Sequence, residues 1–497
     1  MFPLFVLLLP FPLLFFLAKL RKSRKNLPFP CPRKLPIIGN LHQLSAHPHH
    51  SLHKLSLKHG PVMFLQLGSV PTFVISTADA LREVLKTNDV TLSNRPSLYA
   101  VKRYSYGLLS ISFSPYGEYW RQARKVSISE LLSVKRVQSF HRIREEEVAN
   151  LISDIVKACS SSNPVNMSVE LQALSNKIIT RVTFGDGIVA QGYGQILEET
   201  QRVLGGLWLA DYLPWLGWID ALTGLRKKLE KNFKELDEFY NHVIKEHMSG
   251  GTQEDHDPSD LVHVLLQLHK DPFHGMTFSS MSHVKGIITD MFINGTDTSS
   301  ATLTWIMTEL MRNPRVMAKA RDEVRKIAGD KGKVEEHELK DLAYLKLVIK
   351  ETMRLRTPVP LVFRETSETC VIQCHEVPAK TRVIINARAI SLDQNTWENP
   401  EEFYPERFVD NNVDFIGQDF SLVPFGLGRR SCPGINFALP VVELALANLL
   451  YCFDWELPAG MTKVELDVEE ELGIAVHKKN PLVLVPRLFH CVQNDLS

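Results

Sequence analysis

The residues best suited to chemistry lie in one glycine-rich stretch, Phe425-Gly426-Leu427-Gly428-Arg429-Arg430-Ser431-Cys432-Pro433-Gly434. Its glycines let the backbone approach a flat cofactor closely, and its arginines can pair with anionic carboxylates. An apolar helix is expected from Ile435 to Leu450, and its N-terminus beside Cys432 favours a thiolate. A thiolate on haem iron promotes cleavage of the O–O bond. The alternative is a buried structural cysteine after a glycine turn, which would be preferred for an isolated cysteine but not within this pattern.

A second polar group lies in a long predicted helix over about 277–311, within Phe292-Ile293-Asn294-Gly295-Thr296-Asp297-Thr298-Ser299. Glycine inside so long a helix costs about 1 kcal/mol, so a bend or a close approach to a ligand is expected at Gly295. Asp297 and Thr298 offer an acid and a hydroxyl, a pair that could transfer protons to a group bound beside the helix. For Thr298 alone, a hydroxyl satisfied by the preceding helical turn is the simpler interpretation.

Two further pairs of residues each share one face of a predicted helix. Glu351 and Arg354 are three apart on a helix over about 342–356, which ends before a Thr-Pro pair. Taken alone, they would form an ordinary surface ion pair. Trp120 and Arg124 are four apart, and taken alone they indicate a core tryptophan beside a solvated arginine.

These motifs, together with Phe403-Tyr404-Pro405-Glu406-Arg407-Phe408, resemble the cytochrome P-450 family in type and order. The stretch around Cys432 matches the cysteine loop of that family, and the segment around Asp297 resembles its oxygen-activating helix. The resemblance implies a mainly α fold with smaller β-sheets and one large catalytic domain over residues 41–497. It also implies haem b as cofactor and an oxidoreductase that incorporates one atom of O2 into its substrate.

The resemblance implies roles for individual residues. Cys432 is expected as the axial ligand of the haem iron, and Asp297 and Thr298 as the groups that deliver protons. The other expected haem contacts are Arg430, Trp120, Arg124, Phe425, Gly426, Gly428, Gly434 and, by a looser match, Arg364. A network for folding and the haem pocket is expected from Glu351, Arg354 and Arg407. Family members that only rearrange substrates often lack the acid and hydroxyl, so their presence favours monooxygenation.

Asn294 departs from the family pattern, which usually has Ala or Gly one residue before the helix glycine. We hypothesise that Asn294 hydrogen-bonds a polar group of the substrate; the alternative is that it satisfies a bent backbone. Ile293 and Val362 are further candidates for the substrate pocket. Arg356-Thr357 stands where His-Pro is common, and the sequence offers no explanation for it.

The N-terminus predicts a membrane anchor. Residues 1–18 carry no charge and are mostly Leu and Phe, whereas residues 19–25 include five Lys and Arg residues. This pattern is typical of a transmembrane segment with a basic stop, and the proline-rich hinge continues to residue 40. A cleavable signal peptide, the competing interpretation, would carry its charges before the apolar run. The positive-inside rule leaves the catalytic domain on the cytosolic side, and a span of 18 residues suits the thin membrane of the endoplasmic reticulum.

Charge and cysteine content argue against several classes of protein. Lys and Arg number 57 and Asp and Glu 56, so nothing favours binding to nucleic acid. The seven cysteines lack the spacing of a disulfide framework, and Cys370 and Cys374 are interpreted as structural because no second pair completes a zinc site. Without a dinucleotide fingerprint, electrons must come from another protein. By resemblance this is the membrane-bound NADPH–cytochrome reductase, with Arg429, Lys135 and Arg136 as candidates for its basic docking patch.

Hydrophobic periodicity outlines the rest of the chain. A β-hairpin is expected over 62–67 and 72–76, and a strand-rich patch over 371–389. Amphipathic helices are expected over 142–157, 226–245 and 314–327. The segment 207–218 holds three tryptophans and suits no regular helix. Contact with the membrane interface and packing in the core are equally good interpretations of it.

The expected pocket segments are apolar, which indicates a small, mostly apolar substrate. They are 95–116, the tryptophan-rich segment, 288–298, 359–363 and 473–476. The details resemble plant microsomal members of specialised metabolism, so a terpenoid or alkaloid-like skeleton is expected. Two other functions stay open: a haem-thiolate isomerase or dehydratase that needs no reductase, and a non-catalytic haem-binding or scaffold protein.

Overall fold

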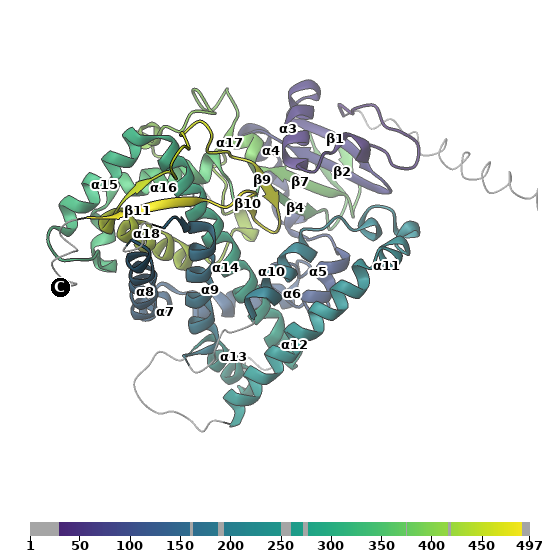
Figure 1. The fold of residues 1–497 in the computed structure, drawn as a ribbon. Coiled ribbons are helices and arrows are strands. Elements are labelled where there is room, and N and C mark those ends of the chain that lie inside the picture. The colour runs from purple at the N-terminus through teal and green to yellow at the C-terminus, as the bar shows by residue number, and fades with distance from the viewer. Residues whose placement is uncertain are drawn as a thin grey trace, which may run out of the picture.

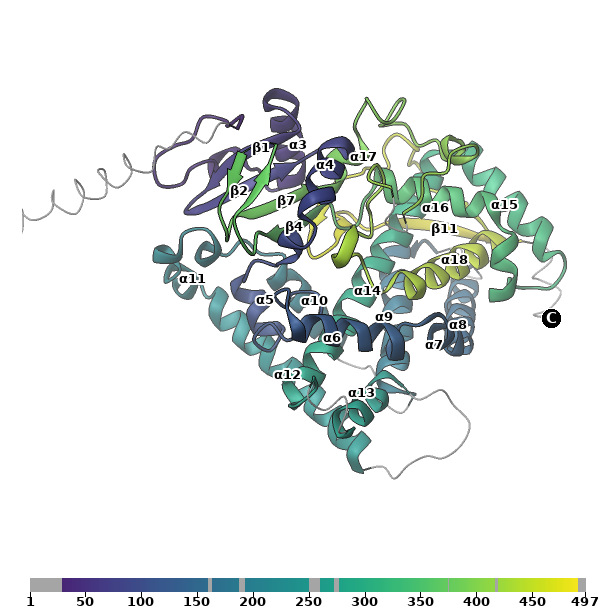
Figure 2. The same cartoon turned by 180° about the vertical axis from the view of Figure 1, so that it is seen from behind.

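The computed structural model describes residues 29–159, 163–186, 193–249, 260–271, 277–373, 375–415 and 419–489. These residues form one body, with most helices gathered on one side and the largest β-sheet on the other (Figure 1). Helix α14 (Met281–Arg312) runs through the middle of the body, as the view from behind also shows (Figure 2). The mainly α fold with smaller β-sheets is therefore confirmed.

The helices agree with the predicted periodicity to within a few residues. The longer ones are α3 (Pro48–His59), α4 (Ala78–Asn88), α6 (Glu118–Val126), α8 (His141–Cys159), α9 (Met167–Phe184), α10 (Tyr193–Leu204), α12 (Leu225–Ser249), α13 (Leu261–Lys270), α14, α15 (Pro314–Ala328), α16 (Ala343–Leu355) and α18 (Ile435–Cys452). The shorter ones are α5 (Tyr99–Tyr104), α7 (Val134–Ser139), α11 (Ile219–Leu222) and α17 (Ala387–Ser391). The expected amphipathic helices correspond to α8, α12 and α15, and the helices expected to carry the chemistry correspond to α6, α14, α16 and α18.

The largest sheet has the strand order β1-β2-β7-β4. Its strands are β1 (Val62–Leu67), β2 (Val70–Ile75), β7 (Arg382–Asn386) and β4 (Leu361–Glu365). The smaller sheets join β3 (Val165–Asn166), β11 (Val483–Leu488) and β8 (Phe453–Glu456), then β9 (Glu470–Leu472) with β10 (Val476–Lys478), and β5 (Cys370–Ile372) with β6 (His375–Val377). β1 and β2 form the predicted antiparallel hairpin, whereas β2 and β7 are parallel.

The strand-rich patch expected over 371–389 ends earlier than predicted. Residues 387–389 begin α17, because the Asn386 side chain accepts a hydrogen bond from the Ala389 amide (3.0 Å) and so caps the helix. Cys370 is a free cysteine, and Cys374 lies outside the described residues.

Close packing explains the glycine in α14. The helix is buried along most of its length and packs against α9, α16 and α18. A Cβ at Gly295 would lie 2.8 Å from Cδ1 of Ile179 on α9. The glycine thus brings two helices together, and α14 continues through it as α-helix. This helix–helix contact explains the glycine, and a close approach to a ligand at Gly295 stays a prediction.

The predicted anchor (1–18) and its basic stop lie outside the described residues, which begin within the hinge at Phe29. Phe29 is buried, with its ring centroid 4.5 Å from that of Phe73, and the Pro30 carbonyl accepts a hydrogen bond from the Phe64 amide. The hinge therefore packs on the largest sheet. Among the described helices, α18 is the one long and apolar enough to span a membrane, but 67% of it is buried in the fold, as expected of a core helix.

The tryptophan-rich segment divides between the two interpretations. It forms short turns at Leu209–Asp211 and Pro214–Leu216, followed by α11, rather than one regular helix. Trp208 is 2% exposed and belongs to the core, whereas Trp215 is 52% and Trp218 57% exposed.

Candidate active site

The loop that carries Cys432 is a tight turn held by backbone hydrogen bonds. The Cys432 amide donates to the Phe425 carbonyl (2.8 Å), and the Gly434 amide donates to Sγ of Cys432 (3.4 Å). Gly428 has a φ of +61°, and a Cβ there would lie 2.5 Å from the carboxylate of Asp89. Only glycine fits this position, and the turn presents the thiol just before α18 begins.

The thiol of Cys432 is exposed in the structure. Desolvation raises the pKa of the thiol, and the Gly434 amide and the Arg124 charge only partly oppose the rise. The neutral thiol is therefore favoured in the protein by itself, and the thiolate expected beside the helix N-terminus stays a prediction. A metal ion bonded to the sulfur would reverse this balance, since a coordinating thiol loses its proton.

Arg430 and Arg124 connect the loop to the N-terminal half of the chain. The buried Arg430 guanidinium donates to three backbone carbonyls, those of Ser93 (2.7 Å), Ile111 (3.1 Å) and Ser114 (2.5 Å). Arg124, on α6, donates to the Ser431 carbonyl at 2.7 Å. The structure thus brings both arginines next to Cys432 in the fold.

Trp120 lies within cation–π distance of both arginines. The guanidinium carbon is 4.1 Å from the ring centroid for Arg430 and 5.5 Å for Arg124. The indole N–H donates to the Ile111 carbonyl (2.8 Å), and the side chain is buried. Its core packing is plain from these contacts, and a haem contact stays a prediction.

Two more arginines border the loop, the buried Arg364 and the half-buried Arg95. Arg364 donates to the Leu427 carbonyl at 2.6 Å and lies 3.4 Å from the Asp89 carboxylate, while its Nε has no hydrogen-bond partner among the described atoms. Arg95 donates to the Ser112 carbonyl at 3.1 Å and to a carbonyl of β4. From its sequence, Arg95 was expected only as part of an apolar pocket segment.

Together Arg95, Arg124, Arg364 and Arg430 form the arginine cluster. Burial and repulsion from the other arginines lower the pKa of Arg430 to about 8 and that of Arg95 to about 9. In the described part of the chain, a carboxylate pairs with only one of the four, Arg364. A group with two carboxylates would neutralise the cluster and give the free Nε of Arg364 a partner. The site therefore fits the two propionates of haem.

On α14, Asn294 and Thr298 lie on one face and are half-buried. The Thr298 hydroxyl donates to the Asn294 carbonyl (2.8 Å), which is the local bond that the preceding turn was expected to offer. The Asn294 side-chain amide donates to Oγ of Ser112 (3.2 Å). Asn294 therefore contacts the same segment as Arg95.

Asp297 is held by the β9–β10 hairpin and makes no hydrogen bond to Thr298 in the structure. Its Oδ1 lies 2.6 Å from Nε2 of His477, and its Oδ2 accepts a bond from the Ala475 amide (3.0 Å). The aspartate side chain is 1% exposed and the histidine 31%. Burial lowers the pKa of His477, but the bond to Asp297 and its charge outweigh burial, so the pKa is raised. A partly exposed histidine thus connects a buried carboxylate to the outside.

The segment around Ile111 joins α14 to the cysteine loop. The Ile111 amide donates to Oδ2 of Asp290 on α14 (2.6 Å), and the Ile111 carbonyl accepts hydrogen bonds from Arg430 and Trp120. Burial raises the pKa of Asp290 to about 6, against hydrogen bonds from this segment. One backbone unit therefore fixes the distance between the two predicted parts of the site.

The structure brings Glu351, Arg354 and Arg407 together. Glu351 and Arg354 are fully buried and 2.7 Å apart, and Arg407 lies 3.0 Å from the same carboxylate. The pair is therefore no surface ion pair. The unexplained Arg356 also has a partner, because its Nε is 2.7 Å from the Glu309 carboxylate of α14.

The two minor pocket candidates differ. Ile293 is 3% exposed and packs in the core, whereas Val362 is half-buried on β4. A cleft of about 440 Å³ opens beside Arg95 and Arg382, but neither Cys432 nor any residue of α14 lines it. Arg95, Pro96 and Leu108 of the expected pocket segment 95–116 are among its lining residues, so the cleft borders that segment on the side away from α14 and Cys432.

Sequence reasoning missed two polar residues of the site, Arg95 and His477. Arg95 is the single charge in residues 90–99, and a lone cation in such a run is a usable signal. His477 stands one residue beyond an expected pocket segment, and no local pattern connects it to Asp297, 180 residues away.

The chain matches the family model described as cytochrome P450 over residues 29–485. It is 51% identical to cytochrome P450 71A9 of Glycine max over 93% of both chains. It is 49% identical to strychnine-11-hydroxylase of Strychnos nux-vomica over 97% of this chain and 96% of the relative. A solved zebra fish cytochrome P450 with abiraterone shares the fold, with a TM-score of 0.75 at 23% identity over 89% of this chain and 100% of that one.

Proposed function

The chain belongs to the cytochrome P450 family of haem-thiolate monooxygenases, and on that basis we propose that it oxidises a small, mostly apolar plant metabolite with electrons from a separate NADPH-dependent reductase. The observation that carries the proposal is the exposed Cys432 thiol beside the arginine cluster, in which Arg364 and Arg430 are buried. One relative is named as a hydroxylase of strychnine, which supports an alkaloid-like or terpenoid skeleton.

The proposed roles follow the geometry of the site. Haem, when bound, supplies the binding and reductive splitting of dioxygen. Cys432 would hold the iron, and the arginine cluster would hold the propionates. We assign the cysteine-loop residues Phe425, Gly426, Gly428 and Gly434 to the close approach of the backbone to the cofactor. Thr298 would face the substrate side of α14, where Asn294 orients a polar group of the substrate.

Proton delivery is proposed to involve Asp297. Its carboxylate is buried, so a proton from solvent needs a carrier, and His477 contacts both the carboxylate and the outside. The hydrogen bond to Asp297 and its charge raise the pKa of His477, so this contact favours a protonated imidazole beside the carboxylate. His477 and Asp297 thus hold a proton directly beside α14.

We place the protein in the endoplasmic reticulum membrane, with residues 1–18 as the anchor, 19–40 as basic stop and hinge, and 41–497 as the cytosolic domain. The apolar N-terminus and its basic stop support the anchor. The exposed Trp215 and Trp218 support a second contact with the membrane interface. For the reductase, Lys135 is an exposed candidate contact, whereas Arg429 already pairs with Asp89 (3.4 Å).

The first test compares the full-length protein with a Cys432→Ser variant in the reduced, carbon monoxide-bound state. We expect a thiolate-type Soret band in the parent and its loss in the variant. An unchanged band in the variant would overturn the assignment of Cys432. Turnover that requires both NADPH and dioxygen would exclude the isomerase or dehydratase alternative.

Asn294 is tested separately with an Asn294→Ala variant. If the side chain orients the substrate, the variant loses affinity or changes the position of oxidation. Unchanged product and affinity would leave Asn294 with its bond to Ser112 as a structural role.

A further inference from the structure

A histidine-rich tract lies at the start of the folded domain, far from Cys432 in sequence. Six of the 18 histidines of the chain fall between residues 42 and 59. Short histidine-rich tracts are one of the compositions that bind metal ions. Composition alone does not make a site, so the folded positions of these side chains decide.

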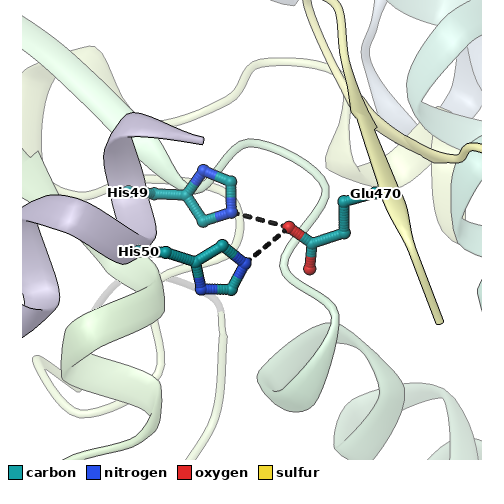
Figure 3. A group of neighbouring side chains, drawn as sticks. All are labelled: His49, His50 and Glu470. Atoms are coloured by element: carbon teal, nitrogen blue, oxygen red, sulfur yellow. Dashed lines mark hydrogen bonds and ion pairs between the residues drawn. The ribbon is translucent and has the colours of Figure 1, made fainter. Parts of the chain in front are cut away.

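Two of these histidines meet one carboxylate (Figure 3). Nε2 of His49 is 2.7 Å and Nε2 of His50 is 3.0 Å from the same oxygen, Oε2 of Glu470. The histidines come from the first turn of α3 and the glutamate from β9, so the cluster joins segments 420 residues apart. All three potential ligand atoms lie within 4.8 Å of one another.

We propose that His49, His50 and Glu470 form a binding site for a divalent transition-metal ion of the zinc class. Two imidazoles and one carboxylate are a known zinc ligand set that leaves a fourth position open. Imidazole nitrogen suits zinc, copper and nickel, whereas magnesium and calcium prefer oxygen ligands. The ligand set therefore selects the class of ion.

One ring nitrogen of His49 is left over by the hydrogen bonds of the cluster. Its Nδ1 is buried and has no hydrogen-bond partner among the described atoms. When Nε2 binds a metal ion, the ring proton can move to Nδ1 without breaking an existing bond on that side.

The surroundings hold the glutamate in place and leave a way in. Arg388 lies 4.0 Å from the other carboxylate oxygen, Oε1, and the His47 ring bonds the Glu470 backbone carbonyl (2.8 Å). Oε2 therefore faces the two imidazoles. The His50 side chain is 40% exposed, which gives an ion access from solvent. The nearby Arg388 cation opposes a divalent ion, so we expect reversible rather than permanent binding.

A bound ion would cross-link α3, which follows the hinge, to the β9–β10 hairpin. The same hairpin holds Asp297 through His477 and the Ala475 amide. Occupancy of the site would therefore stabilise the element that positions Asp297.

The test uses the full-length, haem-loaded protein without an affinity tag, titrated with Zn²⁺ in competition with a chromogenic chelator. We expect one equivalent of Zn²⁺ per chain, with an affinity lowered about tenfold or more in His50→Ala. His50 is partly exposed, so its replacement is compatible with an intact fold. His42→Ala is the matched control, because His42 belongs to the same tract but not to the cluster.

X-ray absorption at the zinc edge supplies a second readout. The parent should show two imidazoles and one carboxylate around zinc, and His50→Ala one imidazole fewer. The absence of saturable binding, or equal affinity in the parent and His50→Ala, would overturn the proposal. So would an equal loss in His42→Ala, because it would indicate binding by the tract without the folded cluster.

Discussion

The β9–β10 hairpin makes two histidine–carboxylate contacts that differ in how far the histidine is buried. In the Asp297–His477 contact the carboxylate is 1% exposed and the histidine 31%. In the Glu470–His49 contact the carboxylate is 7% exposed and the histidine 1%. The same two chemical groups therefore meet at 2.6 and 2.7 Å around a buried carboxylate, with the histidine buried in only one of the contacts.

The outcome for the histidine is opposite in the two contacts. Burial lowers the pKa of His49, and the charge of Glu470 is shared with His50 and Arg388, so the net pKa stays low. Burial also lowers the pKa of His477, but Asp297 outweighs it and the pKa is raised. Burial is the largest single influence on both histidines; it prevails at His49, whose carboxylate partner also faces His50 and Arg388, and it is outweighed by Asp297 at His477.

The largest expected effect comes from neutralising Asp297. Asp297→Asn keeps the size of the side chain and an acceptor for the Ala475 amide, but it removes the proton-carrying group. We expect turnover to fall by about 10²–10⁴-fold, the usual contribution of a positioned acid or base. The measurement is product formation with NADPH, together with the solvent deuterium isotope effect.

A purely structural Asp297 would behave differently. The variant would then lose thermal stability while keeping its isotope effect and most of its turnover per haem. That result would mean that the Asp297–His477 contact, like the Glu470–His49 contact, serves stability and not proton delivery.

Removing the other carboxylate should act on stability instead. Glu470→Ala leaves Arg388 and His49 buried without their partner, which costs about 3 kcal/mol in the free energy of unfolding. Thermal unfolding of the haem-loaded protein measures the loss. Glu471→Ala is the control, because its side chain is exposed. Equal stability of Glu470→Ala and Glu471→Ala would show that the cluster of His49, His50 and Glu470 does not stabilise the fold.

Sequence reasoning recovered the parts of the molecule that local patterns encode. The helices have a period of their own, and the cysteine loop combines a required glycine at Gly428 with a helix start. The shared helix face of Glu351 and Arg354 follows from such short-range spacing, whereas the fold class and the network with Arg407 came from the family resemblance. Local patterns did not show which tryptophans of the segment 207–218 are exposed and which are buried; only the fold did.

Contacts between distant segments were beyond sequence reasoning. His477 meets Asp297, and His49 meets Glu470, across separations of 180 and 421 residues. The raised pKa of the Cys432 thiol has the same origin, because its largest cause is desolvation. Burial is a sum over many segments, and no single motif contains it.

His477→Gln sharpens the comparison by keeping a hydrogen-bond donor for Asp297 while removing the charge. We expect turnover to fall about tenfold, with the activity profile losing the pH dependence that His477 supplies. A histidine with a raised pKa stabilises the fold below its unfolded pKa of about 6.5, and this stabilisation is lost as the pH rises through the folded value. Lys479→Gln, an exposed change on the same hairpin, is the control. A pH profile identical to that of the parent would remove His477 from proton delivery.

His49→Gln should give the smallest effect and the opposite slope. Because burial lowers the pKa of His49 in the folded state, the unfolded chain takes up the proton first as the pH falls below about 6.5. The parent therefore loses roughly 1 kcal/mol of stability for each unit by which the pKa is lowered, and the variant lacks this loss. Thermal unfolding between neutral and mildly acidic pH, with a chelator present to keep the cluster free of metal, measures the difference between parent and variant. This difference should shrink as the pH falls for His49→Gln and grow for His477→Gln. Slopes of the same sign would mean that burial sets the pKa of both histidines and that Asp297 does not outweigh it at His477.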